Sequence, residues 1–160
     1  MKTPEELGLT SKQVANFRKL ERFLWRPLPS ATTFDMRTYL MRATGQECRP
    51  DASTSSECGT TRCALGCGPL AGVPVGSADG WTEYCSRNFC GSRTATWNWV
   101  FHPQWSWVDN TRQGAANRIR WLLEHGCPDN SDQQLWGSEP LCYPIPADRR
   151  QRPRRLATKS

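Results

Sequence analysis

The segment from residue 58 to residue 67 brings three thiols close together, at Cys58, Cys63 and Cys67. A helix would place Cys63 and Cys67 on one face, because they are four residues apart. Cys58 would then lie in the loop that enters this helix. Three thiolates and one further ligand suit the tetrahedral coordination of a structural zinc ion. The sequence thus offers a candidate zinc site at Cys58, Cys63 and Cys67, and the candidate fourth ligands are Cys85, Cys90 and His102.

A second interpretation needs no metal. The spacing Cys-x4-Cys-x3-Cys differs from the usual Cys-x2-Cys knuckle, and free cysteines commonly pack as small buried hydrophobes. The protein would then have no cofactor. A thiol-dependent enzyme is a minor alternative, because a thiol nucleophile needs a nearby base and only His102 and His125 are available. His125 falls in the last turn of a predicted helix, where a cation suits the helix dipole. No catalytic residue is assigned.

Eight cysteines in 160 residues also raise the question of a disulfide-bonded secreted scaffold. The N-terminal segment Met-Lys-Thr-Pro-Glu-Glu is polar and is followed by no apolar run, so no secretory signal is apparent. No segment approaches the roughly 18 apolar residues of a membrane span. We therefore expect a protein of the reducing cytoplasm that makes no membrane contact.

Two helices are predicted by both their periodicity and their ends. Residues 11–25 carry an apolar residue every three or four positions, and Thr10 and Gln13 match a capping box at the start. Residues 111–125 repeat this pattern, with Thr111 as the N-cap and Gly126 after the last turn. Each helix therefore has one face that must be buried.

The remaining elements are predicted less directly. Residues 60–70 are small and apolar and are expected to form a buried helix, and residues 81–90 show one apolar helical face. Residues 97–108 fit a short helix with an irregular turn, or alternatively a β-hairpin. Residues 34–41 suit helix or strand, whereas 44–57 and 71–80 are predicted loops. The expected fold is a mainly α, single small helical domain with irregular loops over residues 4–143, followed by a Pro/Arg-rich basic tail, 144–160.

The net charge of +6 is concentrated in this tail. Residues 147–160 hold six Lys/Arg and one Asp, whereas the preceding 146 residues hold fifteen Lys/Arg and fourteen Asp/Glu. Arginine suits phosphate groups, so the tail could contact nucleic acid or an acidic partner, or it could simply be solvated. The eight tryptophans are expected to pack in the core rather than stack on bases. The candidate contact residues are Arg149, Arg150, Arg152, Arg154 and Arg155.

Several segments together resemble a group of small uncharacterised proteins from bacteriophages and bacterial genomes, over roughly residues 34–128. They are Cys58-Gly-Thr-x-x-Cys63-x-x-Gly66, Trp81-x-x-Tyr84, Trp97-x-Trp99-x-Phe101 and Val108-Asp-Asn-Thr-x-x-Gly-Ala-Ala-x-x-Ile119, running into Leu122-Leu123-x-x-Gly126. The resemblance implies a phage or prophage setting and an intracellular protein, and it implies no activity. Two positions depart from the pattern: Cys67 replaces a frequent His or Trp, and Arg112 replaces a frequent Pro.

These observations favour a non-enzymatic accessory or partner-binding protein in the cytoplasm of a bacterial host, with an unidentified protein partner. The main alternative is a small zinc-stabilised protein associated with nucleic acid, and the minor one is the thiol-dependent enzyme.

The basic tail leads to the first prediction. A chain that ends at Ala147 is expected to keep the melting temperature of the full chain, because the apolar residues of the predicted core precede it. Any affinity for DNA or RNA is expected to disappear with the tail and to fall steeply with salt, since the preceding 146 residues are close to neutral. Calorimetry and filter binding measure the two effects. Binding that survives both truncation and moderate salt would instead place a nucleic-acid site on the domain, near residues 97–107.

Overall fold

The computed structural model describes residues 1–29, 32–51 and 59–144. Helices provide most of its regular structure and a small sheet the rest, which confirms the mainly α class. No helix in these three ranges is long and apolar enough to span a membrane. In chain order the elements are α1 (Pro4–Leu7), α2 (Ser11–Leu24), β1 (Thr33–Phe34), β2 (Leu40–Met41), β3 (Thr61–Arg62), a 3-10 turn (Leu65–Cys67), α3 (Trp81–Cys85), a π-helical turn (Ser86–Cys90), α4 (Thr94–Phe101), α5 (Trp105–Val108), α6 (Arg112–His125) and α7 (Ser131–Leu135).

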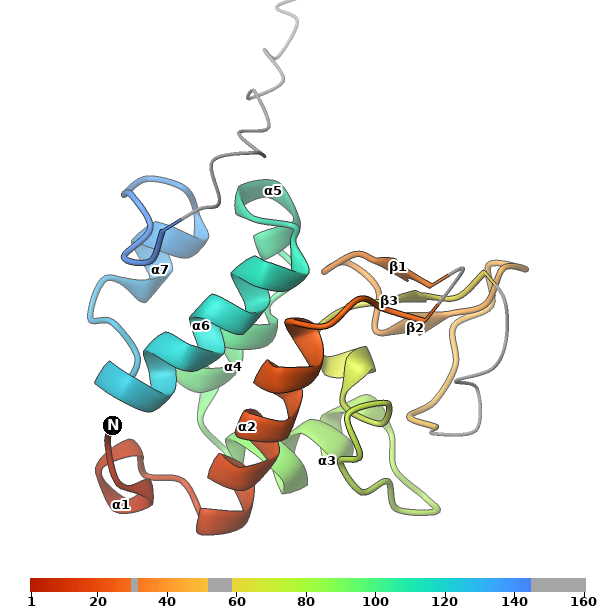
Figure 1. Ribbon diagram of the computed structural model, residues 1–160, viewed down its shortest axis with the longest axis horizontal. Coiled ribbons are helices and arrows are strands. Elements are labelled where there is room, and N and C mark those ends of the chain that lie inside the picture. Colours follow the sequence, from red (N-terminus) through yellow and green to blue (C-terminus); the bar gives the residue numbers. More distant parts are fainter. Residues whose placement is uncertain (30–31, 52–58, 145–160) are drawn as a thin grey trace, which may run out of the picture.

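Helices α2 and α6 lie side by side at the centre, with α4 against α6 and the small sheet to one side (Figure 1). Three phenylalanines join the central elements. The ring of Phe17 on α2 lies 5.1 Å from that of Phe89 in the π-helical turn and 6.0 Å from that of Phe101 on α4. All three side chains are fully buried. The contacts of Phe17 therefore hold together segments that are more than 70 residues apart in the chain.

Both strongly predicted helices are confirmed. Thr10 and Gln13 form the expected capping box, in which each side chain accepts a hydrogen bond from the other residue's backbone N–H. At α6, Thr111 Oγ1 accepts from the N–H of Gly114 at 2.9 Å, and Gly126 ends the helix with a φ of 87°. The predicted apolar faces of both helices are buried, and they comprise Val14, Phe17, Leu20 and Leu24 on α2 and Ala115, Ile119, Leu122 and Leu123 on α6.

The predicted buried helix over residues 60–70 is wrong, although the burial is correct. Residues 61–62 form the central strand β3, which pairs in parallel with β1 and antiparallel with β2. Only the 3-10 turn that follows is helical. The carbonyl of Tyr39 approaches Gly66 so closely that a Cβ at Gly66 would overlap it. Strand pairing with residues distant in the sequence thus overrides the local helical pattern.

Residues 97–108 are helical, which confirms the preferred prediction and excludes the hairpin. A hairpin would alternate buried and exposed residues, whereas Trp99, Val100 and Phe101 are all fully buried. The indole of Trp99 packs edge-on against that of Trp105, with 5.4 Å between the ring centroids. Their N–H groups donate to backbone carbonyls, Trp99 to Arg118 and Trp105 to Asn98, both at 2.9 Å. The chain turns between α4 and α5 at residues 102–104.

The other segments are short or irregular. Residues 34–41, for which helix and strand were both predicted, contain the two-residue strands β1 and β2 at their ends. Residues 71–80 form the predicted loop, as do the described residues of 44–57, apart from an isolated bridge between Met41 and Glu47. Helix α1 was not predicted. It is a single turn that begins with a capping box between Thr3 and Glu6.

The segment from residue 109 to residue 114 connects α5 to α6 through side-chain hydrogen bonds. Asp109 Oδ1 accepts from Thr111 Oγ1 at 2.7 Å, and Asn110 Oδ1 accepts from the N–H of Met36 at 2.8 Å. Gly114 leaves room for the Asp109 carboxylate, which a Cβ at that position would overlap. Residues 109–114 of the Val108–Ile119 motif therefore have a structural role in joining the two helices.

Asp109 also faces a fully buried cation, Arg118 on α6. Arg118 Nη1 lies 3.7 Å from Asp109 Oδ2, and the hydroxyl of Tyr143 joins the two: it accepts from Arg118 at 2.9 Å and donates to Asp109 at 3.0 Å. Burial raises the pKa of Tyr143, so the phenol keeps the proton that it donates. The guanidinium lies 4.3 Å from the ring centroid of Trp105, a cation–π contact.

The hydroxyl of Tyr143 leads to a stability prediction. Tyr143→Phe is expected to lower the free energy of unfolding by about 1–3 kcal/mol, because it removes a hydrogen-bond partner from a buried cation and from a buried carboxylate. Urea titration measures the loss.

Tyr84→Phe is the matched control. The hydroxyl of Tyr84 is also buried but has no hydrogen-bond partner among the described residues. Its removal is expected to change the free energy of unfolding by less than about 0.5 kcal/mol or to raise it. Equal losses in the two variants would show that the network contributes nothing beyond packing of the ring.

Candidate functional sites

Two of the three predicted metal ligands are packed in the core. Cys63 and Cys67 are fully buried and one turn apart, with the N–H of Cys67 donating to the carbonyl of Cys63 at 3.0 Å. The N–H of Gly66 donates to the sulfur of Cys63 at 3.4 Å. Burial raises the pKa of Cys63 to about 12 and that of Cys67 further still. Cys58 lies outside the described residues, so the complete three-thiol site stays a prediction.

The candidate fourth ligands have other neighbours. Cys85 and Cys90 contact each other, with 3.7 Å between their sulfurs. His102 packs between the rings of Trp97 and Trp136, and its Nδ1 accepts from the N–H of Gln104 at 3.0 Å. Within the described ranges, no three His, Cys, Asp or Glu side chains are grouped so that they could hold a metal ion.

Cys85 and Cys90 are adjacent because the helix widens. Cys85 ends α3, and Cys90 ends the π-helical turn, where the N–H of Gly91 donates to the carbonyl of Ser86 five residues earlier. An α-helix would place residues five apart about 140° from each other around the axis, whereas a π turn brings them to one side. Helical spacing does not predict this pair, and each cysteine was expected only as a separate metal ligand.

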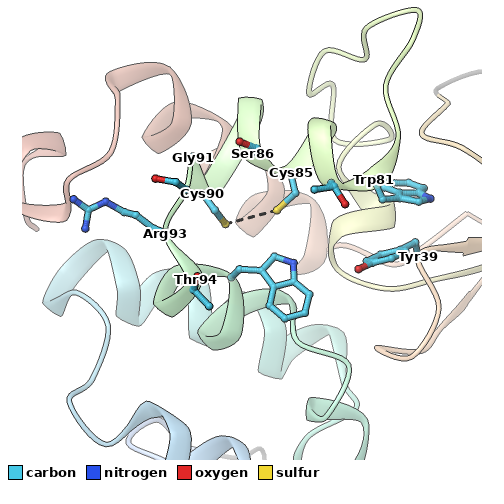
Figure 2. Close-up of a pocket in the computed structure, with 11 residues that line it drawn as sticks. Tyr39, Trp81, Cys85, Ser86, Cys90, Gly91, Arg93 and Thr94 are labelled. Atoms are coloured by element: carbon cyan, nitrogen blue, oxygen red, sulfur yellow. Dashed lines mark hydrogen bonds between the residues drawn. The ribbon is translucent and has the colours of Figure 1, made fainter.

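The two thiols line a cavity of about 280 Å³ between α3, the π-helical turn and α4 (Figure 2). Its aromatic walls are Trp81, Trp97 and Tyr39, and the rings of Trp81 and Tyr39 stack with 5.4 Å between centroids. The described residues that line it include no His, Asp or Glu. Contact with the Cys85 thiol, together with burial, raises the pKa of Cys90 well above its ordinary value. Cys90 therefore lies in this cavity as a thiol whose pKa is raised, next to the sulfur of Cys85.

A second candidate site lies where α5 meets α7. Two tryptophans are largely exposed there: Trp107 on α5 is 75% exposed, and Trp136, directly after α7, is 62% exposed. The chain just after α7 comes close to α5, because a Cβ at Gly137 would lie 3.8 Å from a methyl group of Val108. The ring of His102 lies 6.1 Å from that of Trp136. We call Trp107, Val108, Trp136 and His102 the aromatic end.

The surroundings of the aromatic end are acidic. Residues 126–144 contain three carboxylates and no Lys or Arg, and all three carboxylates, on Asp129, Asp132 and Glu139, are exposed. Asp132 is close enough to oppose the effect of burial, which lowers the pKa of His102. The described chain stops at Pro144, whose carbonyl accepts from Asn117 on α6 at 3.3 Å. The basic tail, including all five candidate arginines, lies outside the described residues.

The tryptophans were predicted to be core residues, which is correct for Trp99 and Trp105 and wrong for Trp107 and Trp136. One signal was present in the sequence: Trp105 and Trp107 are two residues apart, so a helix cannot bury both on one narrow face. Trp25 is also partly exposed, at 40%, but the guanidinium of Arg120 covers its ring at 5.2 Å. Trp107 and Trp136 are thus the most exposed aromatic side chains in the described chain.

The raised pKa of Cys63 leads to a prediction about pH. Its pKa rises from an ordinary value of 9.0 in the unfolded chain to about 12 in the fold, so unfolding releases a proton between these values. Stability is therefore complete below about pH 9 and falls as the pH rises toward 12. Cys63→Ala is expected to reduce this loss in urea titrations. Iodoacetamide at about pH 8 should label Cys63 and Cys67 only after unfolding, because thiolate is the reactive form. Labelling of either residue in the native protein at the rate seen for Cys48 would contradict the burial.

Comparison with known proteins yields no matching family model, curated protein or solved structure. The resemblance to small phage proteins therefore stays a prediction, and the sites described above carry the functional argument.

Proposed function

We propose that this protein is a non-enzymatic binding protein that engages a protein partner through the aromatic end. The observation that carries the proposal is the exposure of Trp107 and Trp136, whose chain neighbours Val108 and Gly137 lie close together. Leaving two large indoles in water forgoes the stabilisation that burial of each ring would give. Tryptophan is also the residue type most enriched among side chains that dominate binding energy at protein interfaces. A partner that covers both rings would recover this apolar surface.

The negative charge around the aromatic end indicates the charge of the partner's surface. The carboxylates of residues 129, 132 and 139 would flank a bound protein. A partner with an apolar patch and Lys or Arg at its rim complements this surface, since opposite charges at an interface favour the correct encounter. The predicted setting, the cytoplasm of a bacterium that carries a phage or prophage, supplies the lysate in which to seek it.

The alternative function is association with nucleic acid, and the five arginines of the tail favour it. The carboxylates beside Trp136 oppose base stacking at the aromatic end, because phosphates would approach like charges. Nucleic acid would therefore be bound by the tail alone, with or without a zinc ion at Cys58, Cys63 and Cys67. The two functions predict different dependence on the tail and on the tryptophans.

Affinity capture from a nuclease-treated bacterial lysate tests the proposal. The wild type, Trp107→Ser, Trp136→Ser and the double variant are compared with Trp25→Ser, which changes an exposed indole elsewhere on the surface. A true partner is retained by the wild type and by Trp25→Ser and is lost from the double variant. The purified partner should then bind the wild type in a defined stoichiometry. Each single Trp→Ser change at the aromatic end should weaken binding roughly 30-fold or more, as expected of a hot-spot residue.

Two results would overturn the proposal. One is that no protein is captured with this dependence on Trp107 and Trp136. The other is that the captured proteins disappear on nuclease treatment or on removal of the tail while the tryptophan variants retain them, which would support nucleic-acid association instead.

A further inference from the structure

The paired thiols of Cys85 and Cys90 have an arrangement that packing alone does not require. Cysteines elsewhere in the core, such as Cys63, contact backbone groups of their own turn. Cys85 and Cys90 instead face each other, with 3.7 Å between sulfurs, and they do so only because the helix adopts π geometry between them. Such turns interrupt the regular hydrogen bonding of a helix and occur frequently at functional sites.

A buried polar network holds the π-helical turn in place. The side-chain amide of Asn88 donates to the carbonyls of Tyr84 at 3.1 Å and of Pro74 at 3.0 Å. In turn, Asn16 on α2 donates from Nδ2 to the backbone carbonyl of Asn88 at 3.1 Å. Both asparagines are buried, so these bonds are shielded from water. The two cysteines are thus positioned by Asn88 of their own turn and by Asn16 from another helix.

The pair can also be reached. Although Cys85 and Cys90 are only 4% and 3% exposed, both line the cavity, as does Trp97. The sulfurs of the two cysteines point toward each other (Figure 2). The cavity walls combine three aromatic rings with Arg93 and with the hydroxyl groups of Thr82, Ser86, Ser92 and Thr94. A small neutral reagent that carries hydroxyl groups matches this lining, because it can pack on the rings and form hydrogen bonds without the cost of removing water from a charge.

We propose that Cys85 and Cys90 form a dithiol site that is converted reversibly to a disulfide by exchange with small neutral dialkyl disulfides. One thiol, as thiolate, attacks a sulfur of the reagent and releases one alkyl thiol, which leaves a mixed disulfide on the protein. The second cysteine then attacks the protein sulfur and releases the other alkyl thiol. The two cysteines lose two protons and two electrons, and the reagent is reduced to two thiols. Alkyl thiols in excess reverse both steps. This inference does not depend on the proposed function.

The test uses the folded full chain and bis(2-hydroxyethyl) disulfide. After exchange, remaining thiols are blocked with N-ethylmaleimide, and the protein is digested with trypsin, which cleaves after Arg62, Arg87 and Arg93. A Cys85–Cys90 bond then links peptide 63–87 to peptide 88–93. The linked form should exceed the mixed disulfide by about tenfold or more, because the second thiol is already in place and its effective concentration is high.

Four single variants assign the bond, since peptide 63–87 also contains Cys63 and Cys67. Cys85→Ser and Cys90→Ser are expected to abolish the linked peptides and to accumulate mixed disulfide on the remaining cysteine. Cys63→Ser and Cys67→Ser are the controls and should keep the link. The proposal is overturned if the link survives in Cys85→Ser, if Cys90 pairs with Cys127 instead, or if exchange occurs only after unfolding.

A measurement on the wild type alone covers the case in which a serine variant fails to fold. Phenylarsine oxide condenses with two neighbouring thiols, forms two As–S bonds and releases one water, with no change in oxidation state. One equivalent should protect both Cys85 and Cys90 of the folded protein from N-ethylmaleimide, and a dithiol reagent should reverse the protection. Continued labelling of both cysteines by N-ethylmaleimide would show that the sulfurs do not act as a pair.

Discussion

Arg118 carries a positive charge into the centre of a helical core, and much of the fold serves to accommodate it. A fully buried guanidinium is strongly destabilising unless it is paired and hydrogen-bonded. Here Asp109 supplies the opposite charge at 3.7 Å, the hydroxyl of Tyr143 connects the two groups, and the face of Trp105 covers the guanidinium. Two nitrogens of Arg118, Nε and Nη2, still have no partner among the described residues. The network around Arg118 therefore contributes more to fixing the positions of Asp109, Tyr143 and Trp105 than to the free energy of folding.

Those partners come from three parts of the chain, and their positions determine the aromatic end. Asp109 fixes the junction between α5 and α6, where Gly114 leaves it room and Thr111 donates to it. Tyr143 anchors the last described residues against α6, after the chain has passed through α7. Helix α7 is thereby kept beside α4 and α5, and Trp136 is displayed next to the element that carries Trp107. A buried ion pair thus supports an exposed pair of indoles.

The surroundings of a buried cysteine decide whether its thiol can take part in chemistry. Cys63 and Cys67 flank Gly66, where the carbonyl of Tyr39 leaves no room for a side chain. Their thiols pack in the core as small apolar groups. Cys85 and Cys90 are almost as buried, but they face each other across the wall of a cavity. Burial raises the pKa of Cys63 and Cys67, and contact with the Cys85 thiol together with burial raises that of Cys90. Only the second pair combines mutual contact with a route for a reagent.

The sequence by itself determined the features that depend on neighbours in the chain. The capping box of α2, the apolar faces of α2 and α6 and the mainly α class follow from contacts within a few residues, so spacing predicts them. Tertiary structure decided the rest. Residues 61–62 became a strand because β1 and β2 pair with them, and residues 85 and 90 met because Asn16 and Asn88 hold a π turn that no local pattern specifies. Likewise, Trp105 is buried against Trp99 and Arg118, which come from other helices, whereas Trp107 on the same short helix is exposed. Such outcomes depend on which distant segments become neighbours, and hydrophobic periodicity does not predict those contacts.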